Sequence, residues 1–286
     1  MSTSREPGRT SGESAEKAQA TRTAALSIAG LDPSGGAGII ADLRTFEALG
    51  VYGMAVVTSV TYQSTIGVLG RYDLAPEVVS SQLDALFSDT PPAAVKTGML
   101  GRADTIAAVA RALEEHEDWP VVVDPVMQSS DGKPLLAVGG LEAMLADLMP
   151  RATLVMPNVA ELEALCGFEL FDVSDLRTGA YWLARQGARG VLVTGWRLEE
   201  EGTDYAADLF FDGADFEVFK TPWVEGLRVH GTGCVMSAAV TAHLARGTDL
   251  RGAVELGARA VSLAIEGAVA VGKGIPCANP GAISGS

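Results

Sequence analysis

The sequence predicts an α/β domain in which a central, mostly parallel sheet lies between two layers of helices. Short apolar runs alternate along the chain with amphipathic stretches, and this alternation is typical of parallel sheets that helices cover on both faces. Hydrophobic residues make up 48% of the 286 residues and charged residues 20%, which is the composition of a globular chain. The 33 glycines allow many tight turns between such elements.

The expected elements follow one another from residue 24 onward. Strands are predicted where the apolar runs are short, at 25–29, 54–61, 94–97, 121–124, 154–156 and 191–194. Helices are predicted where apolar residues recur at helical spacing, at 37–49, 78–87, 103–116, 141–149, 176–186, 232–246 and 250–271. Residues 208–219 alternate around Gly213 and predict a hairpin.

Residues 24–275 are expected to form one domain, with a tail on either side. Residues 1–23 are rich in small polar and charged residues and contain no apolar stretch of the secretory kind, so they predict a disordered tail. Residues 276–286 are expected to form a flexible tail. No run of about 18 apolar residues occurs, so no membrane span is predicted.

The charge and cysteine content narrow the function classes. With 36 acidic against 21 basic residues the net charge is -15, which argues against nucleic acid or an anionic membrane as partner, because both require a basic face. An anionic substrate is compatible with this charge, because clustered backbone amides can hold phosphate. The three cysteines and three histidines show no metal-ligand spacing, and a reducing, cytoplasmic setting is expected.

The loops after the strands are the candidate sites, because parallel sheets bind ligands beyond the carboxyl ends of their strands. In the loop at 30–38, three glycines lie within the four positions 35–38, which lets backbone amides approach a ligand. Residues 36–41 also fit the dinucleotide-binding pattern, but the glycines lie several residues beyond the strand, so a nicotinamide-dependent dehydrogenase is disfavoured. The simpler alternative is a helix start capped by Ser34, with Asp42 one turn into the helix.

Polar side chains also follow the other strands. Gln63 carries an amide that both donates and accepts, as the amine and ring nitrogen of a heterocycle require, although a loop glutamine also caps turns. Lys96 lies within an apolar strand pattern, where a charge needs a partner or a site, and Asp124 ends the next strand. Asn158 and Glu161 share a helix face and suit either a hydrated Mg²⁺ or phosphate, or an ordinary helix cap.

Residues 230–234 read His-Gly-Thr-Gly-Cys and lead into a helix of small residues. The free amides of residues 231–234 would form an anion cradle at the positive end of that helix. At this position Cys234 is expected to have a lowered pKa and thiolate character. Two other interpretations stay open, an inert buried cysteine and a nucleophile paired with His230.

Several of these segments together, in this order, resemble a known family. They are Gly-Leu-Asp-Pro-Ser-Gly-Gly-Ala-Gly at 30–38, Lys-Thr-Gly-Met-Leu at 96–100, Asp-Pro-Val-Met at 124–127, Pro-Asn at 157–158 and His-Gly-Thr-Gly-Cys at 230–234. The set resembles the hydroxymethylpyrimidine/phosphomethylpyrimidine kinases of thiamine biosynthesis, within the ribokinase-like superfamily. The similarity extends from about residue 24 to about residue 271. Pyridoxal kinases share most of these motifs.

The resemblance implies a three-layer α/β/α ribokinase-like domain that forms a homodimer. It implies transfer of the γ-phosphoryl group of ATP to the hydroxymethyl group of 4-amino-5-hydroxymethyl-2-methylpyrimidine, and a second transfer to the monophosphate, with Mg²⁺ as cofactor. By position it implies catalysis by Gly231, Thr232, Gly233 and Cys234, substrate binding by Ala37, Asp42, Thr61, Gln63, Met99 and Val126, nucleotide binding by Lys133, Asn158, Thr194 and Gly195, and metal binding by Asp124 and Glu161.

One departure from the family pattern bears on the activity. Ser130 stands where the family often carries a Lys, so Lys133 or Arg228 would have to neutralise the phosphate instead. A pyridoxal or pyridoxine kinase of vitamin B6 salvage is therefore an alternative on the same scaffold, and a non-catalytic pyrimidine-binding sensor is another. Gln63 favours the pyrimidine, because its amide complements an amine beside a ring nitrogen.

Overall fold

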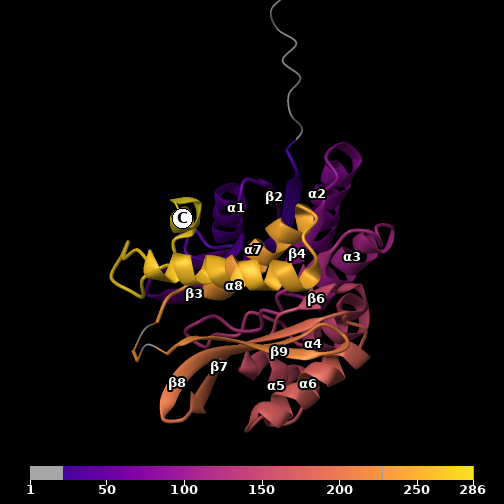
Figure 1. The fold of residues 1–286 in the computed structure, drawn as a ribbon. Coiled ribbons are helices and arrows are strands. Elements are labelled where there is room, and N and C mark those ends of the chain that lie inside the picture. Colours follow the sequence, from indigo (N-terminus) through magenta and orange to yellow (C-terminus); the bar gives the residue numbers. More distant parts are fainter. Residues whose placement is uncertain (1–21, 224, 227, 286) are drawn as a thin grey trace, which may run out of the picture.

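The apolar runs of the chain pair into one sheet of nine strands in the order β3-β2-β1-β4-β5-β6-β7-β8-β9 (Figure 1). The computed structural model describes residues 22–223, 225–226 and 228–285. Strands β2, β1, β4, β5, β6 and β7 run parallel, whereas β3, β8 and β9 pair antiparallel to their neighbours. The strands are β1 (Ala24–Leu31), β2 (Tyr52–Ser64), β3 (Gly67–Asp73), β4 (Ala94–Thr97), β5 (Val121–Val123), β6 (Leu154–Val155), β7 (Val191–Glu200), β8 (Thr203–Phe211) and β9 (Phe216–Pro222).

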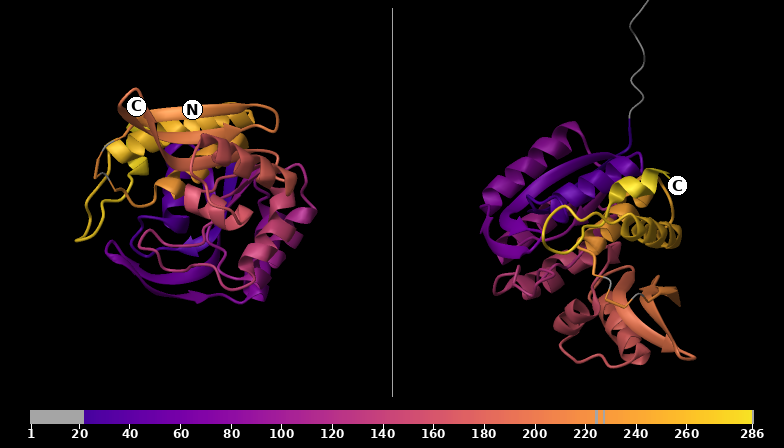
Figure 2. Two further views of the ribbon diagram at one scale, coloured as in Figure 1. Left: turned by 90° about the horizontal axis from the view of Figure 1, so that it is seen from below. Right: turned by 90° about the vertical axis from the view of Figure 1, so that its left-hand side faces the viewer.

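Helices cover both faces of the sheet, so the predicted three-layer α/β/α class is confirmed (Figure 2). Successive side chains of a strand point to opposite faces. In β1, Leu26 and Ile28 pack in the core beneath α2 and α3, whereas Ala25 packs against α1 and α7. The helices are α1 (Gly38–Ala48), α2 (Pro76–Asp89), α3 (Ala103–Glu114), α4 (Gly140–Ala143), α5 (Val159–Cys166), α6 (Val173–Arg185), α7 (Thr232–Ala245) and α8 (Leu250–Glu266).

The predicted strands and the hairpin at Gly213 are confirmed, but strand β3 was missed, and helix α5 was expected only from the helix face that Asn158 and Glu161 share. Strand β3 was not predicted because Val68 is its only buried apolar residue, while Leu69 and Tyr72 are exposed. Helix α5 is only eight residues long, which is too short for a clear helical period. The helix expected at 141–149 is instead the short α4 followed by a π-helical turn and a 3₁₀ turn.

The carboxyl-terminal segment differs from its prediction. Residues 276–285 were expected to be a flexible tail, but Cys277, Ala278 and Ile283 are buried, and a 3₁₀ helix at Pro280–Gly285 packs against α1 and α8. Helix α8 ends at Glu266 instead of residue 271, and the chain returns so that Val269 pairs with Cys277. Three apolar side chains in a short segment are enough to hold it against the domain.

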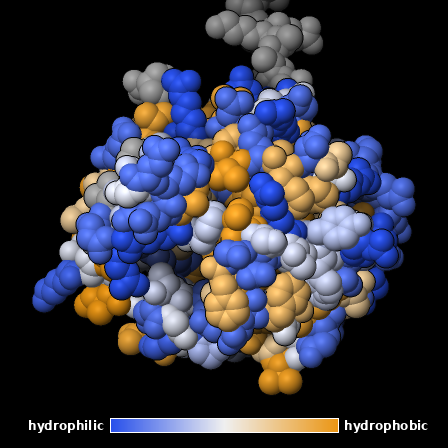
Figure 3. Space-filling view, turned by 60° about the horizontal axis from the view of Figure 1, so that its bottom comes forward, coloured by the Kyte–Doolittle hydropathy of each residue, from blue (hydrophilic) through white to orange (hydrophobic). Residues whose placement is uncertain are grey.

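The tail predicted at residues 1–23 lies almost wholly outside the described residues. None of the described helices is long and apolar enough to cross a bilayer. On the face shown in Figure 3, hydrophobic residues are scattered among hydrophilic ones.

If the carboxyl-terminal segment contributes to the core, truncating its buried side chain will weaken the fold. We expect Ile283→Ala to lower the free energy of unfolding by about 2 kcal/mol, because Ile283 is 8% exposed and the lost methylene contacts leave a cavity. Val271→Ala, at a side chain 65% exposed between α8 and this segment, should change the free energy of unfolding by less than about 0.5 kcal/mol. Urea denaturation measures both, and equal stability of the two variants would contradict the packing.

Candidate active site

A cavity of about 490 Å³ lies beyond the carboxyl ends of the parallel strands. Its walls come from the carboxyl-terminal parts of β1, β2 and β4, from β7, from the loops after β1, β4, β5 and β6, and from the starts of α5 and α7. Most residues predicted for the site are brought together there: Ala37, Thr61, Gln63, Met99, Asp124, Val126, Asn158, Glu161, Thr194, Gly195, Gly231, Thr232, Gly233 and Cys234.

The loop between β1 and α1 is organised by the buried carboxylate of Asp32. Its Oδ1 accepts hydrogen bonds from the Ser34 amide at 2.8 Å and hydroxyl at 2.7 Å, and its Oδ2 accepts from the Ala37 amide at 3.0 Å. Burial opposes ionisation of Asp32, but these bonds and His230 outweigh it and hold its pKa below the ordinary value. Ser34 therefore does not cap α1, whose N-cap is Ala37.

This loop touches the start of α7 through two glycines. Gly231 has φ +85°, and a Cβ there would lie 1.9 Å from the Gly36 carbonyl oxygen. Only glycine allows both the left-handed backbone and this approach. The loop and the predicted anion cradle therefore form one continuous wall.

A fully buried ion pair lies beneath the cavity. Lys96 Nζ is 2.9 Å from Asp42 Oδ1, and Ser27 Oγ donates to Asp42 Oδ2 at 2.6 Å. Burial alone would lower the pKa of Lys96, but the neighbouring acidic groups, Asp42 foremost, outweigh it and raise the pKa. The prediction that Asp42 contacts substrate is therefore wrong, because Asp42 holds Lys96 and is not part of the cavity lining.

Two carboxyl groups share the next wall. Asp124 accepts from Ser237 Oγ at 3.2 Å, and burial raises its pKa although Lys96 opposes the shift. Burial, and then the charge of Asp124, raise the pKa of Glu161 to about 8. A divalent cation would relieve this mutual destabilisation, and two carboxylates leave room for the waters and phosphates that Mg²⁺ prefers. These residues therefore fit a Mg²⁺ site, although the described residues contain no closed cluster of three or more ligands.

Asn158 and Glu161 also form the helix cap that the sequence left open. Asn158 Oδ1 accepts from the Glu161 amide at 2.9 Å, and Glu161 Oε2 accepts from the Asn158 amide at 3.0 Å. This capping box fixes both side chains at the start of α5, where they also line the cavity. The structural and the ligand-binding interpretations are thus compatible.

The wall after β6 and β7 holds the residues predicted for the nucleotide. The Thr194 amide donates to the Pro157 carbonyl at 2.9 Å, and the Gly195 amide donates to Asp208 Oδ1 at 2.9 Å. Burial raises the pKa of Asp208 to about 6 despite this bond. Lys133 does not belong to this wall, because its ammonium donates to the Val68 carbonyl away from the lining, which contradicts its predicted role.

Cys234 lies in the first turn of α7, and its Sγ accepts from the Gly38 amide at 3.4 Å. Burial, only partly offset by Lys96, raises the pKa of the Cys234 thiol to about 12. The predicted lowered pKa is therefore wrong, because the helix terminus does not compensate for the loss of solvent and the nearby carboxylates. Cys234 is a thiol at neutral pH.

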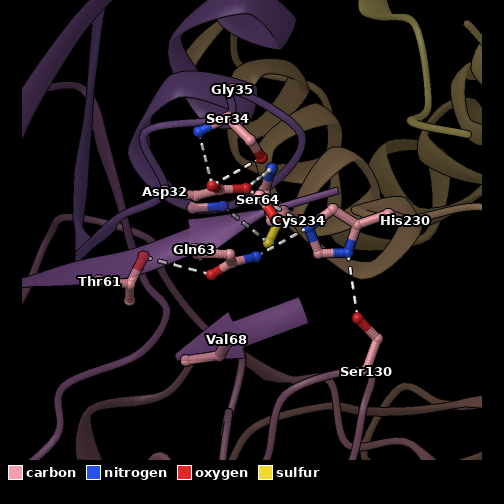
Figure 4. Close-up of polar contacts among 12 residues, drawn as sticks. Asp32, Ser34, Gly35, Thr61, Gln63, Ser64, Val68, Ser130, His230 and Cys234 are labelled. Atoms are coloured by element: carbon pink, nitrogen blue, oxygen red, sulfur yellow. Dashed lines mark hydrogen bonds and ion pairs between the residues drawn. The ribbon is translucent and has the colours of Figure 1, made fainter. Parts of the chain in front are cut away.

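His230 was considered from the sequence only as a partner of Cys234, but its ring contacts other groups (Figure 4). Its Nε2 lies 3.1 Å from Gln63 Nε2 and 3.4 Å from Asp32 Oδ2, and its Nδ1 lies 3.1 Å from Ser130 Oγ. A nucleophile pair with Cys234 is not supported by these contacts. The position of His230 directly before the glycine of the cradle was the available signal.

Comparison with known proteins places this geometry in a family. The family model described as phosphomethylpyrimidine kinase matches residues 32–279. The chain belongs to the phosphomethylpyrimidine kinase family. A hydroxymethylpyrimidine/phosphomethylpyrimidine kinase of Bacillus subtilis is 40% identical over 250 residues, which are 87% of this chain and 92% of that protein.

Two further relatives of this kinase add detail. A thiamine biosynthesis bifunctional protein of Geobacter sulfurreducens is 43% identical over 253 residues, and the chain spans 51% of its length. The crystal structure of an ADP complex of Bacillus subtilis pyridoxal kinase superposes with a TM-score of 0.83 at 32% identity, covering 92% of this chain and 99% of that one. The predicted family and fold are confirmed, and pyridoxal kinases are confirmed as structural neighbours.

The raised pKa of Cys234 predicts slow reaction with alkylating reagents. We expect the rate of iodoacetamide labelling at Cys234, followed by peptide mass mapping, to rise about tenfold per pH unit from pH 7 to pH 10, because only the thiolate reacts. The urea-unfolded kinase serves as the control, and its labelling rate should level off above the ordinary pKa of a thiol. A plateau below pH 9 in the folded kinase would contradict the assignment.

Proposed function

We propose that the chain transfers the γ-phosphoryl group of ATP to 4-amino-5-hydroxymethyl-2-methylpyrimidine, and then to its monophosphate, during synthesis of thiamine diphosphate. One observation carries the proposal. A single cavity joins Gln63, which complements an aminopyrimidine, to the amide cradle at residues 231–234 and to the carboxyl groups of Asp124 and Glu161. The Bacillus subtilis relative is named as a kinase of hydroxymethylpyrimidine and phosphomethylpyrimidine, which supports the proposal.

The pyrimidine would lie between Gln63 and the apolar lining. The Gln63 amide accepts from the amine of the ring and donates to the adjacent ring nitrogen. Ala37, Met99 and Val126 border the same space and would contact the ring faces. Binding at this end leaves the hydroxymethyl group to extend toward Cys234, so that the reacting oxygen is oriented before transfer.

Phosphoryl transfer needs positioning and charge stabilisation more than strong base catalysis. The hydroxymethyl oxygen bonds to the γ-phosphorus as the bridging bond to ADP breaks, and its proton passes to an oxygen of the transferred phosphoryl group. The developing charge meets the amides at the start of α7. Asp124 and Glu161 would hold Mg²⁺, which supplies charge neutralisation for the phosphates when bound. Cys234, being a thiol, orients the hydroxyl instead of removing its proton beforehand.

Arg228 is the better candidate to replace the family Lys. Lys133 is engaged by the Val68 carbonyl, whereas Arg228 Nη2 donates to the Ser130 carbonyl at 3.4 Å, beside the mouth of the site. Its guanidinium can pair with phosphate oxygens in a bidentate manner. The three cysteines are free thiols, which suits a reducing, cytoplasmic compartment.

An ADP-release assay with the pyrimidine, its monophosphate and pyridoxal tests the function. We expect turnover of both pyrimidines, and a fall in kcat of about a hundredfold in Cys234→Ala, because the hydroxyl loses its orienting partner. A higher specificity constant for pyridoxal would move the protein to vitamin B6 salvage, the alternative to which the structural similarity with a pyridoxal kinase points. Tight binding of the pyrimidine without turnover would instead support a sensor.

The raised pKa of Glu161 predicts a pH-dependent Mg²⁺ requirement. Below about pH 8 the Glu161 carboxyl is protonated in the metal-free enzyme, so Mg²⁺ must displace a proton to bind. The Mg²⁺ concentration for half-maximal rate should therefore fall about tenfold per pH unit between pH 6 and pH 8, then level off. Glu161→Gln should abolish this slope. Glu163→Gln, on the same helix but outside the cavity lining, should keep it.

The expected homodimer has a candidate surface on the β2–β3 ribbon. Strand β3 lies at the edge of the sheet, and Tyr62, Ile66, Leu69 and Tyr72 are exposed there by 54%, 71%, 86% and 65%. An edge strand with exposed apolar side chains is prone to pair with another chain. A second copy of this kinase would cover these residues.

Light scattering with size-exclusion chromatography tests this surface. We expect a dimer that Leu69→Glu converts to monomer, because a charge at the centre of the ribbon loses solvent on association. Phe171→Glu, at a side chain 80% exposed before α6, is the matched control and should leave the dimer intact. A monomeric parent protein, or an unchanged dimer in Leu69→Glu, would contradict the proposal.

A further inference from the structure

His230 places one ring nitrogen between two groups with opposite hydrogen-bonding demands (Figure 4). Its Nε2 lies 3.4 Å from Asp32 Oδ2 and 3.1 Å from the amide end of Gln63. A carboxylate only accepts hydrogen bonds, whereas the two ends of an amide differ, one donating and one accepting. The proton on Nε2 therefore decides which end of the Gln63 amide is tolerated beside it.

Asp32 favours a proton on Nε2. Its carboxylate is buried, and both oxygens already accept from Ser34 and Ala37, so it is held as an acceptor. A bare Nε2 would direct its lone pair at Oδ2, whereas an Nε2–H donates to it. In the neutral ring the other nitrogen, Nδ1, then accepts from the hydroxyl of Ser130 at 3.1 Å.

Thr61 constrains the far end of the Gln63 amide. The Thr61 hydroxyl has one proton and two candidate acceptors, the Leu31 carbonyl at 3.0 Å and the Gln63 amide end at 3.2 Å. If the proton goes to Leu31, the Thr61 oxygen is free to accept from the NH₂ group of Gln63. This arrangement is reached from the placement with NH₂ beside His230 by turning the amide group through 180°. The turn needs no extra space, because the two ends of the amide are similar in size.

With the rotated amide, each donor group in this series of hydrogen bonds has an acceptor. Nε2–H of His230 serves the Gln63 carbonyl and Asp32, the Gln63 NH₂ group serves Thr61, and the Thr61 hydroxyl serves the Leu31 carbonyl. With the Gln63 NH₂ group turned to His230, the lone pair of Nε2 faces the Asp32 carboxylate. The single proton of the Thr61 hydroxyl can then serve only one of its two acceptors, the Leu31 carbonyl or the Gln63 carbonyl, so the other receives no hydrogen bond from Thr61. Buried polar groups left without partners are costly, so the first arrangement is favoured.

We propose that His230, through the proton on Nε2, fixes the Gln63 amide with its carbonyl toward His230 and its NH₂ toward Thr61, and so sets the direction in which an aminopyrimidine binds. This inference rests on the proposed function. The free amide edge then offers an acceptor on the His230 side and a donor on the Thr61 side. The exocyclic amine of the substrate lies on the His230 side, and its ring nitrogen lies on the Thr61 side.

The direction has a chemical consequence, because the hydroxymethyl group is attached to the ring carbon next to the one that carries the amine. It therefore extends beyond the amine, toward His230 and Gly231, where the amide cradle begins. The reversed amide would reverse the ring and turn the hydroxymethyl group away from the cradle. His230 is thus a positioning residue that acts through Gln63.

Nitrogen NMR of the imidazoles tests the tautomer without depending on activity. In uniformly ¹⁵N-labelled protein free of substrate at pH 7.5, assigned with His116→Gln and His243→Gln variants, we expect His230 to be protonated at Nε2 and bare at Nδ1. A His230 ring bare at Nε2 would overturn the proposal. If the wild-type protein failed to turn over the pyrimidine, the proposed function would fail while this measurement still stood.

Kinetics of two matched variants test the positioning role. His230→Gln keeps an N–H near the position of Nε2, and His230→Phe keeps the ring but removes the donor. We expect His230→Phe to raise KM for the pyrimidine about tenfold or more with kcat changed less, and His230→Gln to restore KM to within about threefold. The ATP KM of both variants serves as the control for folding.

Pyridoxal supplies the second control, because its ring has no amine beside a ring nitrogen. The His230→Phe substitution should change KM for pyridoxal by less than about threefold, so that discrimination between the two substrates narrows. An equal rise in KM for both substrates, or a His230→Gln variant no better than His230→Phe, would overturn the proposal. Calorimetric affinities for the pyrimidine in the absence of ATP give the same comparison if turnover is weak.

Discussion

The active site depends on the ion pair between Lys96 and Asp42, which joins β4 to α1 beneath the cavity floor. Both side chains are fully buried, and the opposite charge 2.9 Å away offsets part of the cost of burying each one. The ammonium of Lys96 also opposes the rise in pKa that burial imposes on Asp124 and Cys234. One structural charge therefore favours the ionised forms of Asp124 and Cys234, against the larger effect of burial.

The shape of the site comes from the backbone more than from side chains. Gly231 and Gly36 allow the cradle and the first loop to approach more closely than any side chain permits, and Gly38 meets the Gly30 carbonyl in a similar way. A Cβ at Gly36 would lie 2.6 Å from Cys277 Sγ, so the carboxyl-terminal segment packs against the same contact. Backbone amides held in this way are preorganised donors, which is the property that charge stabilisation in phosphoryl transfer requires.

The sequence predicted the location of the site because the motifs follow the carboxyl ends of parallel strands, and topology brings those ends together. It failed where the direction or environment of a side chain decided the outcome. Asp42 lies near the glycine loop in sequence, but its helix position turns it under the sheet toward Lys96. The pKa of Cys234 depends on burial and on carboxylates from distant strands, which no local pattern contains. The role of His230 depends on Asp32, Gln63 and Ser130, which come from the loop after β1, from β2 and from the loop after β5.

The segment after α8 returns to the site and has a consequence for how the domain is made. The Gly274 amide donates to Thr65 Oγ1 across 209 positions of the chain, and the Ala278 amide donates to the His230 carbonyl at 2.9 Å. A nascent chain that has emerged as far as α7 carries every residue of the cavity lining but lacks these two clamps. The site is therefore complete only after the segment that follows α8 has docked, and an intermediate without this segment would lack both hydrogen bonds. Between translation of α7 and docking of the segment that follows α8, the partly folded kinase is prone to misfold and aggregate.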